Sequence, residues 1–140
     1  MNKVMEVITS RRSIRRYTGE EVPLQVLEDI LAAVRWAPSW GNTQCWEIIV
    51  ISDQQVKEQL QGVLSPKNPG GPAIIGAPLV LAVCGKNGIS GFYKGNAVTG
   101  HGDWKLYDLG LATQNILLAA ASHGLGTVVI GALDHEKAAA

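Results

Sequence analysis

Residues 11–17 concentrate side chains that could bind an anion. Four guanidinium groups and the hydroxyl of Ser13 fall within six residues of the run Arg11-Arg12-Ser13-Ile14-Arg15-Arg16-Tyr17. A guanidinium group stays charged at biological pH and pairs bidentately with phosphate. The formal net charge of the chain is +0, so this positive charge is local and favours one small anion over a long polyanion. A solvated helix end is the alternative interpretation, because cations are also favourable at helix C-termini.

A second polar segment, residues 37–46, contains Ser39, Asn42 and Gln44 between two tryptophans. Asn and Ser commonly close turns, so this segment could simply join a helix to a strand. It could also lie over a flat polar heterocycle, whose edge needs hydrogen bonds and whose face needs apolar contact.

A third segment, residues 124–132, has glycines on both sides of an apolar run. Glycine allows another group to approach the backbone closely. A core strand flanked by turns is the simpler interpretation when this segment is taken alone. It is not a phosphate-binding loop with a lysine, and it lacks the G-x-G-x-x-G pattern.

Composition excludes several classes of function. The 140 residues suit one domain, residues 1–140, and only 17% are charged, which favours a surface covered by a second subunit. The pI of about 6.8 argues against a general nucleic-acid binder, and no apolar run is long enough to span a membrane. The two cysteines form no disulfide framework, so we expect a reducing, cytoplasmic compartment. The three histidines have no metal-ligand spacing, and we expect no metal.

Apolar periodicity and breaker residues predict the elements that position these segments. The predicted helices are 2–12, 23–36, 53–64, 104–123 and 134–140, and the predicted strands are 46–51, 79–84 and 126–131. We expect residues 65–78 and 85–103 to be loops. The helix 104–123 is apolar on nearly all its faces, which predicts burial between two subunits.

Taken together, the three segments resemble the nitroreductase family of flavin enzymes. Residues 11–15 are similar to the family's R-R-S-x-R signature. Residues 37–46 are similar to its A-P-S-x-x-N-x-Q-P-W loop, with Cys45 in place of proline and a bulkier Trp40 in place of the common serine. Residues 108–126 resemble its long central helix and the turn that follows. The resemblance covers about residues 3–137.

This resemblance implies an α+β fold with a central, mostly antiparallel sheet packed by helices, in an intertwined homodimer. It implies FMN as the cofactor and NAD(P)H as the reductant, with nitroaromatics or quinones reduced in a ping-pong cycle. Carried over by position, Arg11 and Arg15 bind the phosphate, and Arg12 and Ser13 reach the phosphate, ribityl chain or pyrimidine edge. The resemblance also places Pro38, Ser39 and Asn42 against the flavin of the partner subunit or at the pocket mouth. It places the backbone of Ile130 and Gly131 beside the flavin ring.

The family usually continues with a further helix and a strand that carries a basic residue for the phosphate. We therefore expect this chain to be C-terminally truncated, with residues 11–15 holding the phosphate largely alone. No side chain is an obvious catalytic proton donor. The alternative functions are a non-catalytic or degenerate FMN-binding protein and, less favoured, another branch of the family, such as reductive dehalogenation or flavin destruction.

Overall fold

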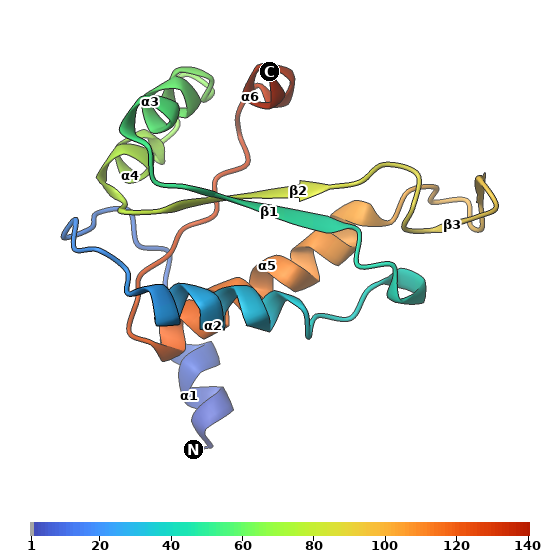
Figure 1. The fold of residues 1–140 in the computed structure, drawn as a ribbon, viewed down its shortest axis with the longest axis horizontal. Coiled ribbons are helices and arrows are strands. Elements are labelled where there is room, and N and C mark those ends of the chain that lie inside the picture. The colour runs from blue at the N-terminus through green and yellow to red at the C-terminus, as the bar shows by residue number, and fades with distance from the viewer. Residues whose placement is uncertain (1) are drawn as a thin grey trace.

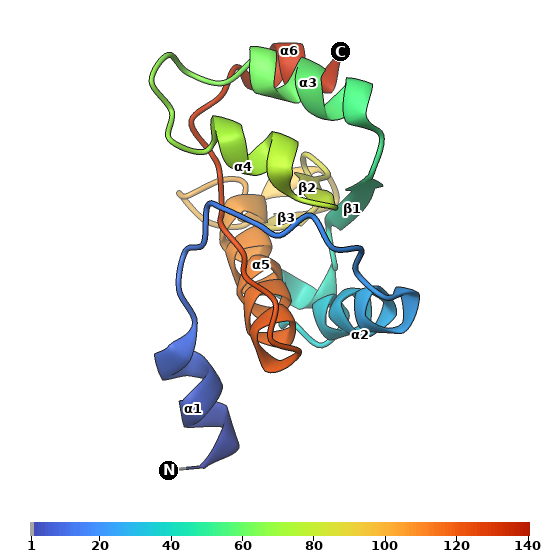
Figure 2. The same cartoon turned by 90° about the vertical axis from the view of Figure 1, so that its left-hand side faces the viewer.

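Two antiparallel strands, β1 (Trp46–Ile51) and β2 (Val80–Gly85), lie at the centre of the fold. Their register pairs Trp46 with Gly85 and Ile51 with Val80. The computed structural model, shown in Figure 1, describes residues 2–140. Helices α2 (Leu24–Val34) and α5 (Lys105–Ser122) cover one side of this pair. Helices α3 (Gln54–Gly62) and α4 (Gly71–Gly76) lie on the other side, as Figure 2 shows. The expected α+β architecture is confirmed.

The main core forms where α2 and α5 pack together against the strands. Small and branched side chains at four-residue intervals make one face of each helix fit its neighbour. The buried members are Ile30, Val34, Ala37, Ala112, Ile116 and Ala120, with Trp46, Ile48, Leu81 and Val83 packed against them from the strands. Asn115 adds a polar link, because its Nδ2 donates to the carbonyl oxygen of Ala33 over 2.9 Å.

Side-chain caps begin helices α1, α3 and α6. The Asn2 side chain accepts from the backbone N–H of Met5 at the start of α1 (Lys3–Ser10), and Asp53 accepts from that of Val56 at the start of α3. Asp134 caps α6 (His135–Ala139) by accepting from the backbone of Lys137. Such caps satisfy donors that have no partner inside the helix. Helix α1 buries none of its residues and projects from the body of the chain (Figures 1 and 2).

The expected strand over 126–131 is wrong. This segment forms one isolated parallel bridge between Thr127 and Ser13, and the segment after it forms one antiparallel bridge between Leu133 and Leu64. Between those two points the chain runs across the sheet without a neighbouring strand, so its β-branched residues have no ladder to join. The segment is only partly covered within one chain, with Val129 60% exposed, so its apolar, β-branched composition did not imply strand pairing.

The two predicted loops contain regular structure. Residues 65–78 include α4, which begins at Gly71 with proline in its first turn. Residues 85–103 include a hairpin of β3 (Phe92–Tyr93) and β4 (Asn96–Ala97). Its two connecting residues, Lys94 and Gly95, have φ angles of 48° and 79°. Such angles suit a two-residue turn that matches the natural twist of the strands.

Helix α5 is only partly enclosed within one chain. Its buried face consists of Asp108, Ala112, Ile116 and Ala120. On its first turn, the side chains of Leu106 and Tyr107 are 75% and 61% exposed. Within residues 2–140, no helix is both long and apolar enough to cross a membrane.

Candidate functional site

The arginine run lies against the segment that follows α5. The backbone N–H of Ile14 donates to the carbonyl oxygen of Thr127 over 2.9 Å, and Ser13 and Thr127 form the parallel bridge. Glycine at position 126 permits this approach, because a Cβ there would lie 2.9 Å from the Cβ of Ile14. Two of the three segments predicted from the sequence therefore meet in one chain, although they are far apart in the sequence.

The arginines of this run differ in what they contact. The Nη1 of Arg12 donates to the carbonyl oxygens of Thr9 and Arg11, over 2.7 and 2.8 Å. These bonds turn Arg12 back onto the end of α1. Arg11 is half-buried and Arg15 is exposed, and neither guanidinium group forms an ion pair or hydrogen bond within residues 2–140. Their positive charge is therefore uncompensated by this part of the chain, which leaves it free to attract an anion.

Tyr17 closes the other end of the run. Its hydroxyl donates to the carbonyl oxygen of Ile14 over 2.7 Å. Burial raises the pKa of the Tyr17 phenol, and the nearby positive charge of Arg15 acts in the opposite direction. The phenol consequently stays protonated at neutral pH and keeps the backbone of the run in place.

Beyond Thr127 the chain is extended and fixed at its far end. The Ile130 side chain packs over Gly70, where a Cβ would lie only 2.6 Å from its Cδ1. The carbonyl oxygen of Ala132 accepts from the Ser65 backbone and from the Asn68 side chain, over 3.0 and 2.9 Å. The backbone N–H groups from 128 to 132 donate no hydrogen bond within the described part of the chain. They form a row of donors along an anchored backbone, and Gly131 adds no side chain beside it.

Residues 38–45 form the third predicted segment, which includes the short helix η1 (Trp40–Asn42). The Ser39 hydroxyl accepts from the backbone N–H of Gln44 over 2.9 Å and so closes the turn. Gly41 and Asn42 both have φ angles of 54°, the left-handed region in which glycine and asparagine are best tolerated. Pro38 and Asn42 are exposed, and Ser39 is half-buried. The turn therefore presents polar groups at the surface.

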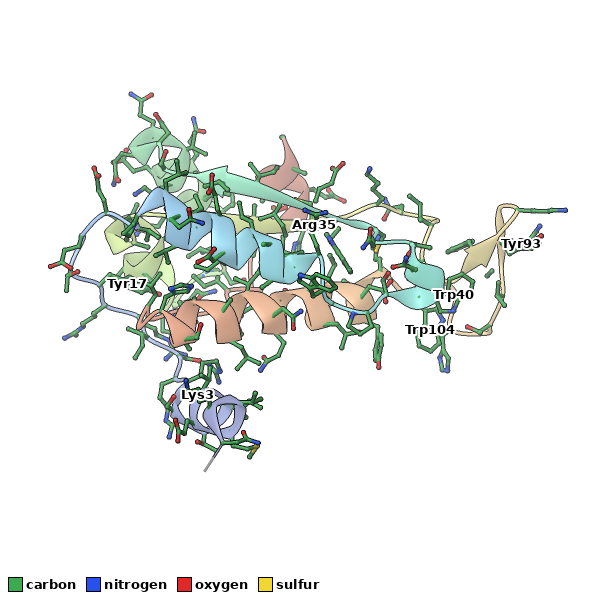
Figure 3. All side chains as sticks on the ribbon, turned by 60° about the horizontal axis from the view of Figure 1, so that its bottom comes forward. Lys3, Tyr17, Arg35, Trp40, Tyr93 and Trp104 are labelled. Carbon is green, nitrogen blue, oxygen red and sulfur yellow. The ribbon has the colours of Figure 1, made fainter. Side chains whose placement is uncertain are left out.

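The loop and the arginine run lie at opposite ends of the molecule. Figure 3 shows Trp40 beside the first turns of α5 and Tyr17 near its last turns. The 18 residues of α5 span about 27 Å at the usual rise of an α-helix. One chain therefore brings together the arginine run and residues 126–132, but it leaves residues 38–42 far from both.

Two of the three segments predicted from the sequence each contain a buried hydroxyl that is unpaired within the described residues. Among the described residues, Thr43 Oγ1 and Thr127 Oγ1 are buried without a hydrogen-bond partner. Buried polar groups are usually paired, so these two hydroxyls are exceptions. One hydroxyl lies in the loop 38–45 and the other lies beside the arginine run.

Asp108 was not among the residues singled out from the sequence as part of the site. It lies in the first turn of α5 and is fully buried, and its carboxylate accepts from the loop that contains Trp40. The signal in the sequence was a carboxylate within an otherwise apolar helix. The described residues contain no group of three or more His, Cys, Asp or Glu side chains suited to a metal ion.

A separate apolar groove of about 380 Å³ lies between α1, α2 and α5, away from these polar segments. Its lining includes Val4, Val7, Ala33 and Leu118. Its lining is mostly apolar and offers few hydrogen-bonding groups, whereas the arginine run is positively charged.

The family model "Nitroreductase family" matches residues 8–73 and 65–140. A protein of Methanothermobacter thermautotrophicus, provisionally named NADH dehydrogenase/NAD(P)H nitroreductase, is 35% identical over 128 residues; the match covers 91% of this chain and 60% of the relative. An Archaeoglobus fulgidus protein with the same provisional name is 31% identical over 137 residues, which cover 98% and 72%.

A solved structure gives the same result at the level of the fold. The Desulfovibrio desulfuricans protein, provisionally named a nitroreductase and crystallised in complex with FMN, superposes with a TM-score of 0.76 at 34% identity. The match covers 94% of this chain and 70% of that one. The chain thus spans 60–72% of these three proteins. Its three segments, its fold and the match of the family model along nearly its whole length agree, and the chain belongs to the nitroreductase family.

Proposed function

We propose that this protein is an FMN-dependent oxidoreductase that uses NAD(P)H to reduce nitroaromatics, quinones or similar acceptors. The observation that carries this proposal is the meeting of the arginine run with residues 126–132 at the bridge between Ser13 and Thr127. It places positive charge beside a row of free backbone donors. A phosphate ester attached to a flat polar ring needs both groups, which supports FMN over a simple anion.

Arg11 and Arg15 are the residues proposed to bind the phosphate. Their guanidinium groups have no carboxylate partner in the described chain, and Ser13 adds an exposed hydroxyl between them. Arg12 is proposed as a weaker contributor, because its Nη1 is held by two carbonyl oxygens. The FMN complex of the Desulfovibrio desulfuricans relative supports the identity of this ligand.

The backbone at Ile130 and Gly131 is proposed to lie along the ring. Its free N–H groups can donate to the polar edge of a heterocycle, and the Ile130 side chain stays packed on Gly70. When bound, FMN supplies the hydride chemistry, and the protein orients its ring and limits access of water. A backbone N–H in this row can stabilise negative charge that develops at a ring nitrogen.

Residues 38–42 are proposed to contact the flavin of the second subunit in a homodimer. Their distance from the arginine run along α5 separates them from a flavin bound by their own chain. The exposed Leu106 and Tyr107 on the first turn of α5 provide apolar surface at the same end. A second copy that covers this end would bring its arginine run to the loop.

The proposed ping-pong cycle can be tested with purified protein and added FMN. We expect the absorption of oxidised flavin to appear on the protein, to bleach with NADPH or NADH under anaerobic conditions, and to return when a nitroaromatic or quinone is added. The initial rate is measured while one substrate is varied at several fixed concentrations of the other. The lines of the double-reciprocal plot should be parallel. The provisional name of the Methanothermobacter thermautotrophicus relative supports this choice of reductants.

Two other outcomes would change the proposal. Flavin that binds but is not bleached by either nicotinamide would identify a non-catalytic FMN-binding protein of the same fold. Protein that binds no FMN after purification with added cofactor would contradict both functions. Halogenated phenols belong in the acceptor panel, because loss of halide would indicate reductive dehalogenation.

A further inference from the structure

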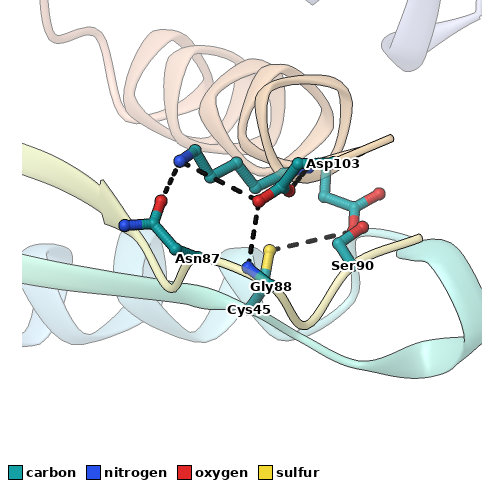
Figure 4. Close-up of polar contacts among 7 residues, drawn as sticks. Cys45, Asn87, Gly88, Ser90 and Asp103 are labelled. Carbon is teal, nitrogen blue, oxygen red and sulfur yellow. Dashed lines mark hydrogen bonds and ion pairs between the residues drawn. The ribbon is translucent and has the colours of Figure 1, made fainter. Parts of the chain in front are cut away.

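Three parts of the chain meet at the carboxylate of Asp108, which has no exposed surface. The Ser90 hydroxyl donates to Oδ2 over 2.6 Å, and the thiol of Cys45 lies 3.8 Å from the same oxygen (Figure 4). The backbone N–H of Trp40 donates to both carboxylate oxygens, over 3.1 and 3.2 Å. One side chain of α5 therefore holds both the loop 38–45 and the segment that follows β2.

This carboxylate is balanced by neutral donors rather than by a cation. Within residues 2–140, no lysine, arginine or histidine side chain forms an ion pair with it. Its position in the first turn of α5 places it at the positive end of the helix dipole. A buried carboxylate is costly unless its oxygens accept hydrogen bonds, so the donors around Asp108 are strongly held.

The donors include the thiol of Cys45. Burial raises the pKa of this thiol, and the negative charge of Asp108 raises it further. The thiol therefore stays protonated at neutral pH and keeps its hydrogen for the carboxylate. Cys45 directly precedes β1, so this contact also fixes the end of the loop that enters the sheet.

Hydrogen bonds also join the two ends of the segment that follows β2. Asp103 accepts from the backbone N–H groups of Gly88 and Lys105, over 3.0 and 2.9 Å, and the N–H of Trp104 donates to the carbonyl oxygen of Ser90. These bonds tie together the two ends of the loop 88–104, and Figure 4 shows the one between Gly88 and Asp103. Ser90 then connects this closed loop to Asp108.

We propose that Asp108 is a positioning residue for the flavin site of the partner subunit. By holding the N–H of Trp40, it fixes the turn of residues 39–42 that faces the flavin whose phosphate the partner's Arg11 binds. This inference rests on the proposed function, because it requires an FMN site shared between two chains. Because Asp108 is fully buried, it would act on the flavin site through Trp40.

A mixed dimer separates this role from a local one. Chains carrying Arg11→Ala and chains carrying Asp108→Ala are given different affinity tags, and the dimer that holds one of each is purified with both tags. If Asp108 serves the partner's site, one site of this dimer carries both lesions and the other site carries neither. We expect about one FMN per dimer with the dissociation constant of the wild-type protein, while each variant homodimer binds at least about tenfold more weakly.

The opposite result would assign Asp108 to its own chain. If the mixed dimer has no site of wild-type affinity, each lesion has damaged a different site, and the proposal is overturned. Wild-type protein that binds no FMN would instead contradict the proposed function, and this inference with it. Flavin fluorescence titration and the flavin absorbance per dimer distinguish these results.

A second pair of variants tests the same contact with Asp108 in place. Trp40→Pro removes the N–H at the first position of η1, where proline fits the backbone after an extended Ser39. Trp40→Ala removes the indole and keeps the N–H. We expect Trp40→Pro to bind FMN at least about fivefold more weakly than Trp40→Ala. A mixed dimer of a Trp40→Pro chain and an Arg11→Ala chain should again have one site of wild-type affinity. Equal affinities for the two Trp40 variants would overturn the proposal, including in the case where Asp108→Ala does not fold.

The conservative variants distinguish positioning from general stability. Asp108→Asn can retain one acceptor for the Trp40 N–H while its amide donates to Ser90, so we expect FMN affinity to recover to within about threefold of wild type. Ser90→Ala removes a donor without touching the Trp40 bond, and we expect a similarly small change in affinity despite a lower unfolding midpoint. A loss of FMN affinity in Ser90→Ala as large as that in Asp108→Ala would show that the loop 88–104 carries the effect, contrary to the proposal.

Discussion

The arginines of residues 11–16 differ in what their guanidinium groups already contact. Arg12 donates to two carbonyl oxygens at the end of α1, whereas Arg11 and Arg15 have no such partners within residues 2–140. A charged donor that is already bonded has to give up those bonds before it binds a ligand. Within one short run, the structure thus separates an arginine that ends a helix from arginines available to an anion.

This difference leads to a prediction for Arg11. Replacing Arg11 by alanine should remove one charge-assisted phosphate contact, worth about 1.5–3 kcal/mol, which corresponds to about 10- to 150-fold in the Kd for FMN. Arg16→Ala is the matched control, because Arg16 carries the same charge in the same run and is not among the residues proposed to bind the phosphate. Flavin fluorescence titration of both variants measures the effect. Equal Kd values would contradict the placement of the phosphate.

Lys57 is unsuitable as such a control, although its sequence context in a polar helix suggests an exposed position. Its side chain is 5% exposed, and its Nζ donates over 2.9 Å to the carbonyl oxygen of Ala77 at the end of α4. A cation at that position satisfies an unpaired carbonyl group and complements the helix dipole. Removing it would change the packing of α3 on α4 as well as the charge.

At the scale of elements, the contact between the arginine run and residues 126–132 depends on Gly126. An alanine there would place its Cβ 2.9 Å from the Cβ of Ile14, so one backbone has to move. We expect Gly126→Ala to lower the free energy of unfolding by about 1–3 kcal/mol and to weaken FMN binding by displacing the run. At Gly131, a Cβ meets nothing within 4 Å, and Gly131→Ala should change stability by less than about 0.5 kcal/mol.

Urea unfolding of the two glycine variants without cofactor measures this difference. The comparison uses the same substitution at both positions, five residues apart in one segment. Equal unfolding midpoints would show that the segment does not pack tightly on Ile14.

The loop 88–104 is expected to loosen in acid. Two backbone N–H bonds, from Gly88 and Lys105, lower the pKa of Asp103 below its ordinary value of 3.8. A carboxyl group whose pKa falls on folding stabilises the native state above its unfolded pKa, and this stability is lost as pH falls through the folded pKa. Asp103→Asn should therefore be less stable than wild type at pH 7, with the difference shrinking as pH falls below about 4. Urea midpoints at pH 7, 5 and 3 test this, and a constant difference would exclude the ionised carboxyl as its cause.

Sequence patterns predicted the elements whose stability is local or periodic. The structure has a helix within the predicted ranges 53–64, 134–140 and 23–36, and a strand over the apolar run 46–51. The interpretation of 126–131 as a strand failed because strand formation needs a neighbour, and no pattern within the segment says whether one is present. The sequence also did not reveal that Asp108 holds the loop 38–45. Its hydrogen-bond donors come from positions 40, 45 and 90, and only the fold brings them together.

The candidate site was predictable in part. Motif resemblance indicated all three segments, and the structure joins the first to the third through Ser13 and Thr127. The structure adds that α5 separates residues 38–42 from the other two segments within one chain, and the proposed homodimer would bring them to a partner's site. Such a shared site would depend on the assembly of two chains, which the pattern within one segment does not encode.

At the scale of the whole molecule, large apolar side chains remain exposed in the helical layer formed by α2 and α5. Trp36, two residues after the end of α2, is 85% exposed, and Leu106 in the first turn of α5 is 75% exposed. Exposed apolar surface of this kind marks a contact with another protein surface when it gathers on one face. The proposed homodimer would cover the face that also carries the loop 38–42.

We therefore expect Leu106→Glu to weaken both dimer formation and flavin binding. Burial of a leucine side chain contributes about 1.5–3 kcal/mol, so the dimer dissociation constant should rise by at least about tenfold, and burying an unpaired carboxylate adds to this cost. Val56→Glu is the control, because Val56 is 39% exposed on α3, across the sheet from α5. Sedimentation velocity over a range of concentrations gives the dissociation constant, and flavin content in each species follows from absorbance. If the site is shared, Leu106→Glu should lose flavin in parallel with dimer and Val56→Glu should lose neither, whereas a monomer that retains wild-type flavin affinity would show that one chain holds FMN without its partner.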